Sequence, residues 1–118
     1  QATPKRIEMV RALPGHLASV LADLFVFFSD VYVSRHDNME GGAVHDPCAV
    51  LALTHPHLFT TKPQHVVIEL NGEHTRGMTM IDQRGLIERL NPNCEVVWDV
   101  KAEEAFDVIV QAIGHYSK

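Results

Sequence analysis

Apolar residues recur at helical spacing through the first part of the chain. Ile7, Val10 and Leu13 repeat every three residues and predict a short helix. Thr3 is a suitable N-cap for it, and Pro14 marks its end. A second apolar stripe, with spacings of three to four residues, predicts a longer core helix; its members are Leu17, Val20, Leu21, Leu24, Phe27, Phe28 and Val31.

The pattern dissolves over residues 34–42, a polar stretch that ends in two glycines. Adjacent glycines permit backbone angles closed to other residues, so we expect a mobile loop here. Asp46 followed by Pro47 then predicts the start of a third helix, with Asp46 as its N-cap and Thr54 near its end. Because this segment is apolar nearly all round, the pattern predicts burial on most of its sides.

Alternation with a period of two replaces the helical pattern after this helix. Residues 65–70 alternate as a strand, and Asn71-Gly72 is the strongest two-residue signal for a hairpin, with a returning strand over 73–81. A third strand is predicted over 94–100, with Trp98 as a core residue.

The last helix is predicted from about Ala102 to His115, with Glu103 and Glu104 in its first turn, where the helix dipole favours negative charge. The order helix, helix, helix, hairpin, strand, helix predicts an α/β fold. Three strands are few for such apolar helices, so we expect the sheet to be incomplete in this chain.

Composition narrows the possible functions. The 118 residues fit one domain, and 10 Lys and Arg against 15 Asp and Glu give a formal charge of -5 with the basic residues scattered. This argues against nucleic acid or a membrane as a partner. Cys48 and Cys94 suit reduced, buried thiols in a cytoplasmic protein, although one disulfide stays open. The start at Gln1, without an initiator Met, is interpreted as a cut or processed end.

The strongest candidate for chemistry is His45-Asp46-Pro47. The chain contains eight histidines, a residue type that changes charge near neutral pH. His45 lies next to the Asp46 carboxylate at the start of the predicted third helix. Two interpretations are open from spacing alone. In the first, His45 and Asp46 form a functional site; in the second, Asp46 only caps the helix and His45 merely precedes it.

Three segments in order carry a family resemblance: GAVHDPCAV over 42–50, HPHLF over 55–59 and TRGMTMID over 75–82. Together they closely resemble the C-terminal third of the inosine-uridine nucleoside hydrolases. The resemblance implies that residues 1–118 are the C-terminal segment of a single nucleoside hydrolase domain. It also implies the C-terminal part of an open, mostly parallel, Rossmann-like sheet with flanking helices and a β-hairpin.

The same resemblance implies an activity and a site. Such enzymes use calcium to hydrolyse the N-glycosidic bond of ribonucleosides to ribose and free base, in purine and pyrimidine salvage. By resemblance, Asp46 is a calcium ligand and His45 the proton donor to the leaving base. Tyr32, Arg35 and His36 lie where the family places residues that cover the base; one of them is expected to line the pocket, and a solvated helix end is the alternative.

The chain departs from the family in one respect, because it lacks the aspartate cluster DxDxxxDD that supplies most calcium ligands. Its aspartates do not stand in that spacing; they are Asp23, Asp30, Asp37, Asp46, Asp82, Asp99 and Asp107. Calcium takes about 6–8 oxygen ligands, so Asp46 alone leaves an incomplete site. We therefore expect an isolated chain that is inactive and a partner in the N-terminal remainder of the same enzyme.

Further expectations follow from the same resemblance: a ribonucleoside substrate of unspecified base, a homo-oligomer, and a cytoplasmic location. Two other classes of function remain as alternatives. One is a non-enzymatic binding or assembly module that keeps the scaffold without the aspartate cluster. The other is a zinc protein built on histidines such as His55 and His57, which lack the usual zinc-ligand spacing.

Overall fold

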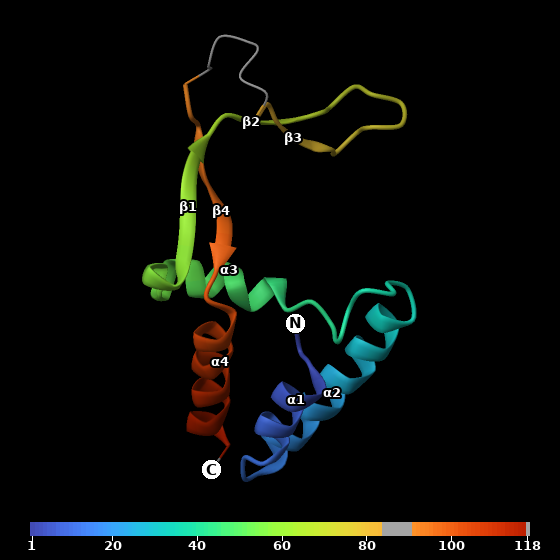
Figure 1. Cartoon of the computed structure of the whole chain (residues 1–118), viewed down its shortest axis with the longest axis vertical. Coiled ribbons are helices and arrows are strands. Elements are labelled where there is room, and N and C mark those ends of the chain that lie inside the picture. Colours follow the sequence, from blue (N-terminus) through green and yellow to red (C-terminus); the bar gives the residue numbers. More distant parts are fainter. Residues whose placement is uncertain (84–90, 118) are drawn as a thin grey trace. The chain divides into compact units, whose positions relative to one another are not determined.

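The computed structural model describes residues 1–83 and 91–117, which form two compact units (Figure 1). The helical unit contains residues 1–58 together with the helix that follows Val100, and the strand unit is Phe59–Val100. Each unit is described by itself. The prediction of a single domain segment over the whole length stays a prediction.

The first two helices form as their sequences predict. Helix α1 is Pro4–Arg11, and the Thr3 hydroxyl accepts a hydrogen bond from the Arg6 amide at 3.5 Å. Helix α2 is His16–Val33. Gly15, which precedes α2, has φ 91°, a conformation that side chains disfavour, so glycine is needed at this junction.

The last helix, α4 (Ala102–Tyr116), shares one core with α1 and α2. The predicted bounds of this helix are confirmed to within one residue. The fully assembled core of the helical unit consists of Ala2, Ile7, Val10, Ala18, Ala22, Phe106 and Ile113, with Leu13, Leu21, Phe25, Val44, Ile109 and Val110 packed against it. Alanines on α2 leave room for the backbones to approach closely.

The interpretation of α2 as a core helix is wrong for most of its predicted stripe. Its buried residues are Ala18, Ala22 and Ser29, whereas Phe27 is 69% exposed and Leu24 is 55% exposed. The apolar arc of α2 is wider than one neighbouring layer can cover, and the small residues on one side of it are the ones that contact α1. The rest of the arc faces away from the core of the unit.

Helix α2 is also, among the described residues, the one helix long and apolar enough to cross a membrane. It has 18 residues and a mean hydropathy of 1.5, lies near the N-terminus and is 17% buried. Core helices of soluble proteins meet the same criteria. Asp23 stands within α2 and pairs with Arg11 at 2.9 Å, and such a charged pair is costly inside a bilayer.

Helix α3 is His45–Thr54 and begins two residues earlier than predicted. Val44 occupies the N-cap position, no side chain caps the helix, and Asp46 lies in the first turn, so the capping role predicted for Asp46 is wrong. The predicted burial is wrong as well, because Leu51 alone is buried and Leu53 is 86% exposed. The apolar sequence of α3 favours burial on most sides, but the described residues do not cover this helix in that way.

A short 3-10 helix, η1 (Pro56–Leu58), precedes the first strand of the strand unit. Strand β1 (Phe59–Gln64) pairs antiparallel with β4 (Cys94–Val100), and the register shifts between Thr60 and Thr61. Strand β4 is confirmed. Strand β1 was not predicted, because its sequence FTTKPQ contains a proline and shows no apolar alternation.

Trp98 is not a core residue of the strand unit. Its side chain is 41% exposed, and the Lys62 Nζ lies 4.5 Å from the centroid of its ring. This is a cation–π contact between neighbouring strands.

The two cysteines are both free; Cys48 is half-buried and Cys94 is exposed, so burial is not confirmed for Cys94.

The predicted hairpin is confirmed, but its turn is longer than expected. Strands β2 (Val66–Ile68) and β3 (Thr79–Ile81) pair antiparallel, with Val66 opposite Ile81. The Glu69 carboxylate accepts hydrogen bonds from the amides of Asn71 and Gly72, at 2.7 and 3.0 Å. Because this carboxylate binds the amides of the predicted turn, the chain forms a wider loop instead of a two-residue turn.

These amide hydrogen bonds lower the pKa of the Glu69 carboxyl below its ordinary value, which is about 4.3 in model peptides. The ionised form is therefore favoured in the folded loop. Its contribution to stability is present above the ordinary pKa and is lost as the pH falls through the lowered value. We expect a carbon-detected NMR titration to find a pKa for Glu69 below the ordinary value of a glutamate carboxyl. An unshifted pKa for Glu69 would contradict the hydrogen-bonded loop.

All strand pairs in the described parts of the chain are antiparallel, in two sheets of two strands each. The mixed α/β composition is confirmed, whereas a parallel, Rossmann-like sheet is not found within these residues. Parallel strands need partners from elsewhere in a chain, joined through crossover connections. The parallel sheet therefore remains an expectation for a larger domain.

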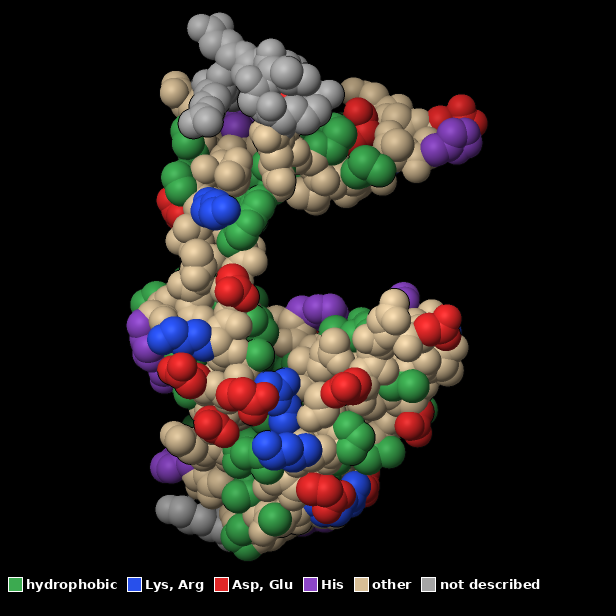
Figure 2. Space-filling model, viewed as in Figure 1, with side chains coloured by type: hydrophobic (Ala, Val, Ile, Leu, Met, Phe, Trp, Pro, Cys, Tyr) green, Lys and Arg blue, Asp and Glu red, His purple; other side chains and the backbone are tan. Residues whose placement is uncertain are grey.

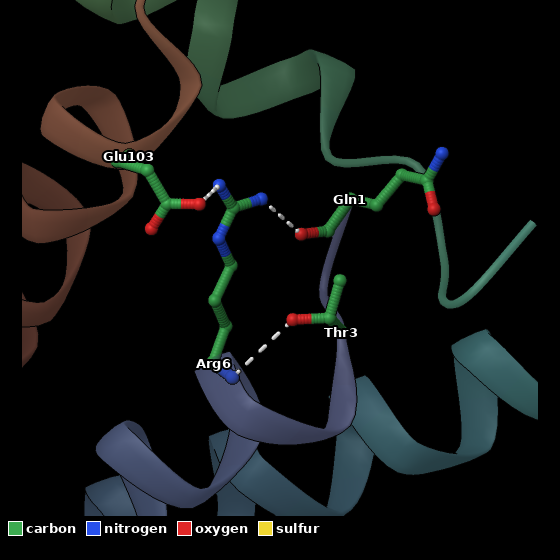
Figure 3. A network of polar contacts seen from close by, with 4 residues as sticks. All are labelled: Gln1, Thr3, Arg6 and Glu103. Atoms are coloured by element: carbon green, nitrogen blue, oxygen red, sulfur yellow. Dashed lines mark hydrogen bonds and ion pairs between the residues drawn. The ribbon is translucent and has the colours of Figure 1, made fainter.

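Arg6 joins α1 to α4 in the helical unit (Figure 3). Its guanidinium donates to the Glu103 carboxylate at 2.8 Å and to the Gln1 carbonyl at 2.7 Å. The guanidinium carbon lies 5.2 Å from the ring centroid of Phe106. Arg6 is 8% exposed, so this pairing satisfies a charge that is largely removed from water.

We expect Arg6→Ala to lower the free energy of unfolding by about 2–3 kcal/mol, because it removes charge-assisted hydrogen bonds and the packing of the stem. Arg11→Ala is the matched control, since Arg11 forms exposed pairs with Glu8 and Asp23 and should cost less than about 1 kcal/mol. Urea unfolding followed by circular dichroism measures both. Equal losses would show that the Arg6 network contributes nothing beyond an exposed pair.

Candidate active site

The end of α2 and the start of α3 bring two predicted site residues into contact. The Tyr32 hydroxyl lies 3.2 Å from Nε2 of His45, within hydrogen-bond distance. Tyr32 belongs to the last helical turns of α2, and His45 is the first residue of α3. The bond occupies one ring nitrogen of His45 and thereby orients the imidazole.

Aromatic rings continue from this contact along α2. The ring centroid of Tyr32 lies 4.7 Å from that of Phe28, 6.0 Å from that of His36 and 6.3 Å from that of His45. All three ring pairs are tilted. Tilted contacts at these distances are favourable between aromatic rings, so the four residues form one aromatic cluster.

Asp46 lies directly after His45, in the first turn of α3. Both residues are exposed. The first turn of a helix favours acidic side chains, and Asp46 is the acidic residue in the first turn of α3. This arrangement places a candidate proton donor and a hard oxygen ligand side by side, both accessible to a bound molecule.

Arg35 is the predicted pocket residue that the structure does not bring to this cluster. Its side chain is exposed and makes no hydrogen bond or ion pair with residues 1–83 or 91–117. Tyr32 and His36, the other two candidates, are in the cluster through their rings. The predicted set therefore divides into two residues beside His45 and one apart from it.

A complete metal site is absent from the part of the chain that the structure describes. No group of three or more His, Cys, Asp or Glu side chains in it could hold a metal ion. His55 and His57 form a tilted pair with 6.0 Å between ring centroids, and they belong to no group of three possible metal ligands among the described residues. Asp46 can supply one carboxylate, which is too few for calcium.

Two features of this region escaped sequence reasoning. Ser29 is buried and bonds to two backbone segments: its hydroxyl donates to the Ala2 carbonyl at 3.1 Å and accepts from the Gly42 amide at 2.9 Å. Phe28 adjoins the site and was counted only as core. One feature of the sequence could have indicated Ser29: it is the one polar residue among the buried residues of α2, which also include Ala18 and Ala22.

The two glycines before α3 also have a different role from the one predicted. Gly41 and Gly42 are buried, and neither has a positive φ. A Cβ on Gly41 would meet the Ala2 carbonyl oxygen, and a Cβ on Gly42 would meet Phe28 at 2.7 Å. Glycine is needed here for close approach of backbones, and the segment is held by the Ala2 amide, which donates to the Gly42 carbonyl at 2.7 Å.

The chain is thus a mixed α/β protein with an exposed histidine and aspartate side by side at the start of a helix. The family model for inosine-uridine preferring nucleoside hydrolases matches residues 1–107. The chain therefore belongs to the inosine-uridine preferring nucleoside hydrolase family.

Individual relatives agree with this family. The chain is 34% identical over 118 residues to the pyrimidine-specific ribonucleoside hydrolase RihA of Shewanella woodyi, and 31% identical over 117 residues to that of Klebsiella pneumoniae. These alignments cover 100% and 99% of the chain. They cover 38% and 37% of the relatives, so the chain spans well under half the length of these proteins.

Solved structures show the same likeness. The purine-preferring ribonucleoside hydrolase from Gardnerella vaginalis superposes with a TM-score of 0.79 at 27% identity, over 98% of this chain and 36% of that one. A plant nucleoside hydrolase superposes with a TM-score of 0.77 at 18% identity, over 95% of this chain and 36% of that one, and shows the likeness of fold alone.

Proposed function

We propose that this chain is the C-terminal part of a nucleoside hydrolase that cleaves the N-glycosidic bond of ribonucleosides to ribose and free base. The observation that carries the proposal is the hydrogen bond between Tyr32 and His45, next to Asp46, within a chain that belongs to this family. A family fold alone would leave the function open, but these three side chains supply a site.

The proposed reaction adds water to the anomeric carbon of ribose as the bond from that carbon to the base nitrogen breaks. As its oxygen bonds to the anomeric carbon, the attacking water loses one proton to solvent, from which the proton donor is reprotonated. The electron pair of the broken bond goes to the base, which then takes up a proton. His45 supplies this proton, and Tyr32 keeps the imidazole in one orientation through Nε2. Positioning of this kind contributes to rate because a misplaced proton donor loses its geometry toward the leaving group.

The aromatic cluster supports a nucleobase as the group that is recognised. Phe28 and Tyr32 on α2 and His36, three residues beyond its end, have rings in contact, and flat bases stack on such rings. Arg35 remains a weaker candidate for contact with the substrate. The relatives include pyrimidine-specific and purine-preferring enzymes, so the proposal names ribonucleosides as a class.

Calcium is proposed as the metal of the complete enzyme, with Asp46 as one of its ligands. Calcium binds carboxylate oxygens, and when bound it would hold the attacking water and lower the cost of deprotonating it. The described residues do not form this site by themselves, so the remaining ligands must come from outside them. The isolated chain is accordingly proposed to be inactive.

The partner proposed for this chain is the N-terminal remainder of the same enzyme. The relatives are longer than this chain, and the helical unit exposes apolar side chains that a larger domain would cover. Phe27 and Leu24 on α2, and Val50 and Leu53 on α3, are each more than half exposed. Coverage of these four side chains by a further layer would remove a large apolar area from water.

The proposal also includes a homo-oligomer and a cytoplasmic enzyme of nucleoside salvage. Exposed apolar residues of the strand unit, such as Ile68, Met78 and Met80, are available for contact between subunits. Two free cysteines fit a reducing compartment. The surface of the helical unit in Figure 2 shows basic side chains beside acidic ones, which supports a partner other than nucleic acid or an anionic membrane.

The test is reconstitution with calcium present. The chain is mixed with the matching N-terminal part of the enzyme, and release of ribose from inosine and from uridine is measured. Activity of the mixture with none from either part alone supports the proposal. An inactive but stable complex would instead favour the second candidate, a binding or assembly module that lacks catalysis.

A further inference from the structure

The segment that leads into α3 is held to α2 at both of its ends. Ser29 binds the backbone of Gly42, and Tyr32 binds the side chain of His45. Ser29 and Tyr32 are one helical turn apart on α2, while Gly42 and His45 are three residues apart along the chain. A tether of three residues spans at most roughly 10 Å, so fixing Gly42 restricts where His45 can lie.

The contacts around Ser29 form a closed set of hydrogen bonds. The hydroxyl donates to the Ala2 carbonyl and accepts from the Gly42 amide, while Ala2 and Gly42 bond directly as an isolated antiparallel bridge. A second bond reinforces this connection, because the Glu40 amide donates to the side-chain oxygen of Gln1 at 3.1 Å. Three segments of the helical unit thus meet at one side chain.

The surroundings of Ser29 leave no ready substitute for its hydroxyl. The residue is 7% exposed, so water has little access to the two backbone groups that it binds. The close approach of Gly42 to Phe28 and Ser29 leaves no room for a Cβ, which shows how tightly the segment lies against α2. Removing the hydroxyl would leave a buried carbonyl and a buried amide each short of one partner.

We propose that Ser29 is a positioning residue for catalysis, which acts by anchoring Gly42 so that His45 meets Tyr32 in the productive geometry. This inference rests on the proposed function, because it takes His45 as the proton donor. Ser29 touches neither substrate nor the reacting atoms. Its effect is therefore expected in turnover more than in the binding of substrate.

The test is a double-mutant cycle in the complete enzyme. Ser29→Ala should lower kcat for inosine or uridine by roughly 10- to 100-fold, with KM changed by less than about 3-fold. The loss should be smaller for an activated nitrophenyl riboside, whose leaving group needs no proton. In the His45→Ala background, Ser29→Ala should have little further effect on kcat, because the group that it positions is gone.

Ser19→Ala is the matched control, since Ser19 is an exposed serine on the same helix and should leave kcat unchanged. Thermal unfolding shows whether each variant is folded at the assay temperature. If Ser29→Ala does not fold, Ser29→Cys, which keeps the size and weakens the hydrogen bonds, is taken through the same cycle. Equal losses on both substrates, or losses that add to that of His45→Ala, would overturn the positioning role.

The outcomes also separate this inference from the proposed function. If the wild-type enzyme hydrolyses no nucleoside, or His45→Ala leaves kcat unchanged, the proposed function fails before Ser29 is considered. If both of those results are as expected and Ser29→Ala retains full kcat, the proposed function stands and the positioning role alone is wrong.

Discussion

His45→Ala in the complete enzyme is expected to lower kcat for natural nucleosides by about 10²- to 10⁴-fold, the usual contribution of a general acid. The reason is local: His45 is the exposed imidazole at the start of α3, and Tyr32 orients it. A nitrophenyl riboside should lose much less, since its leaving group departs without protonation. Steady-state kinetics on inosine, uridine and the nitrophenyl substrate measure the difference.

Tyr32→Phe is the companion variant, because it keeps the ring beside Phe28 and removes only the hydroxyl that contacts His45. We expect a loss in kcat smaller than that of His45→Ala, with the same dependence on leaving group. His57→Ala serves as the control, because the ring of His57 contacts that of His55 outside the aromatic cluster. Equal losses on natural and activated substrates after His45→Ala would remove the proton-donor role.

Local signals predicted the helices well where the chain supplies its own partners. Helices α1 and α4 form at their predicted places because Thr3 caps the first, and the apolar stripe of the second, with Phe106 and Ile113, meets a core within the unit. Burial was predicted wrongly for α2 and α3. Periodicity shows which side chains favour burial, but no element among the described residues covers Phe27 or Leu53, and both stay exposed.

The candidate site was likewise predictable from the sequence only in part. The adjacency of His45 and Asp46 is a property of the sequence, and the family resemblance gives it a meaning. The contact with Tyr32 is a property of the tertiary structure, because it depends on how the 34–44 segment returns to α2. Ser29 and Gly42 determine that return, and no local pattern marks a single serine as the residue that binds two distant backbones.

Asp46→Asn in the complete enzyme is expected to weaken calcium binding by on the order of 10- to 100-fold, since ligand charge is a main determinant of calcium affinity. Turnover at limiting calcium should fall with it. Asn keeps the shape of the side chain but replaces one carboxylate oxygen with an amide nitrogen, so the change removes the charge and one possible oxygen ligand. Isothermal titration with calcium measures affinity independently of activity, and ribose release at several calcium concentrations measures turnover.

The competing interpretation of Asp46 is purely structural, and the structure predicts how much Asp46 would then contribute to stability. Asp46 lies in the first turn of α3 without capping it, so its interaction with the helix dipole is worth about 0.3–1 kcal/mol. A purely structural Asp46 would give a small loss in thermal stability and unchanged calcium affinity. Asp107→Asn, an exposed aspartate on α4, is the control and should alter neither calcium affinity nor turnover. Because the two interpretations differ in calcium affinity by at least about 10-fold, one titration distinguishes them.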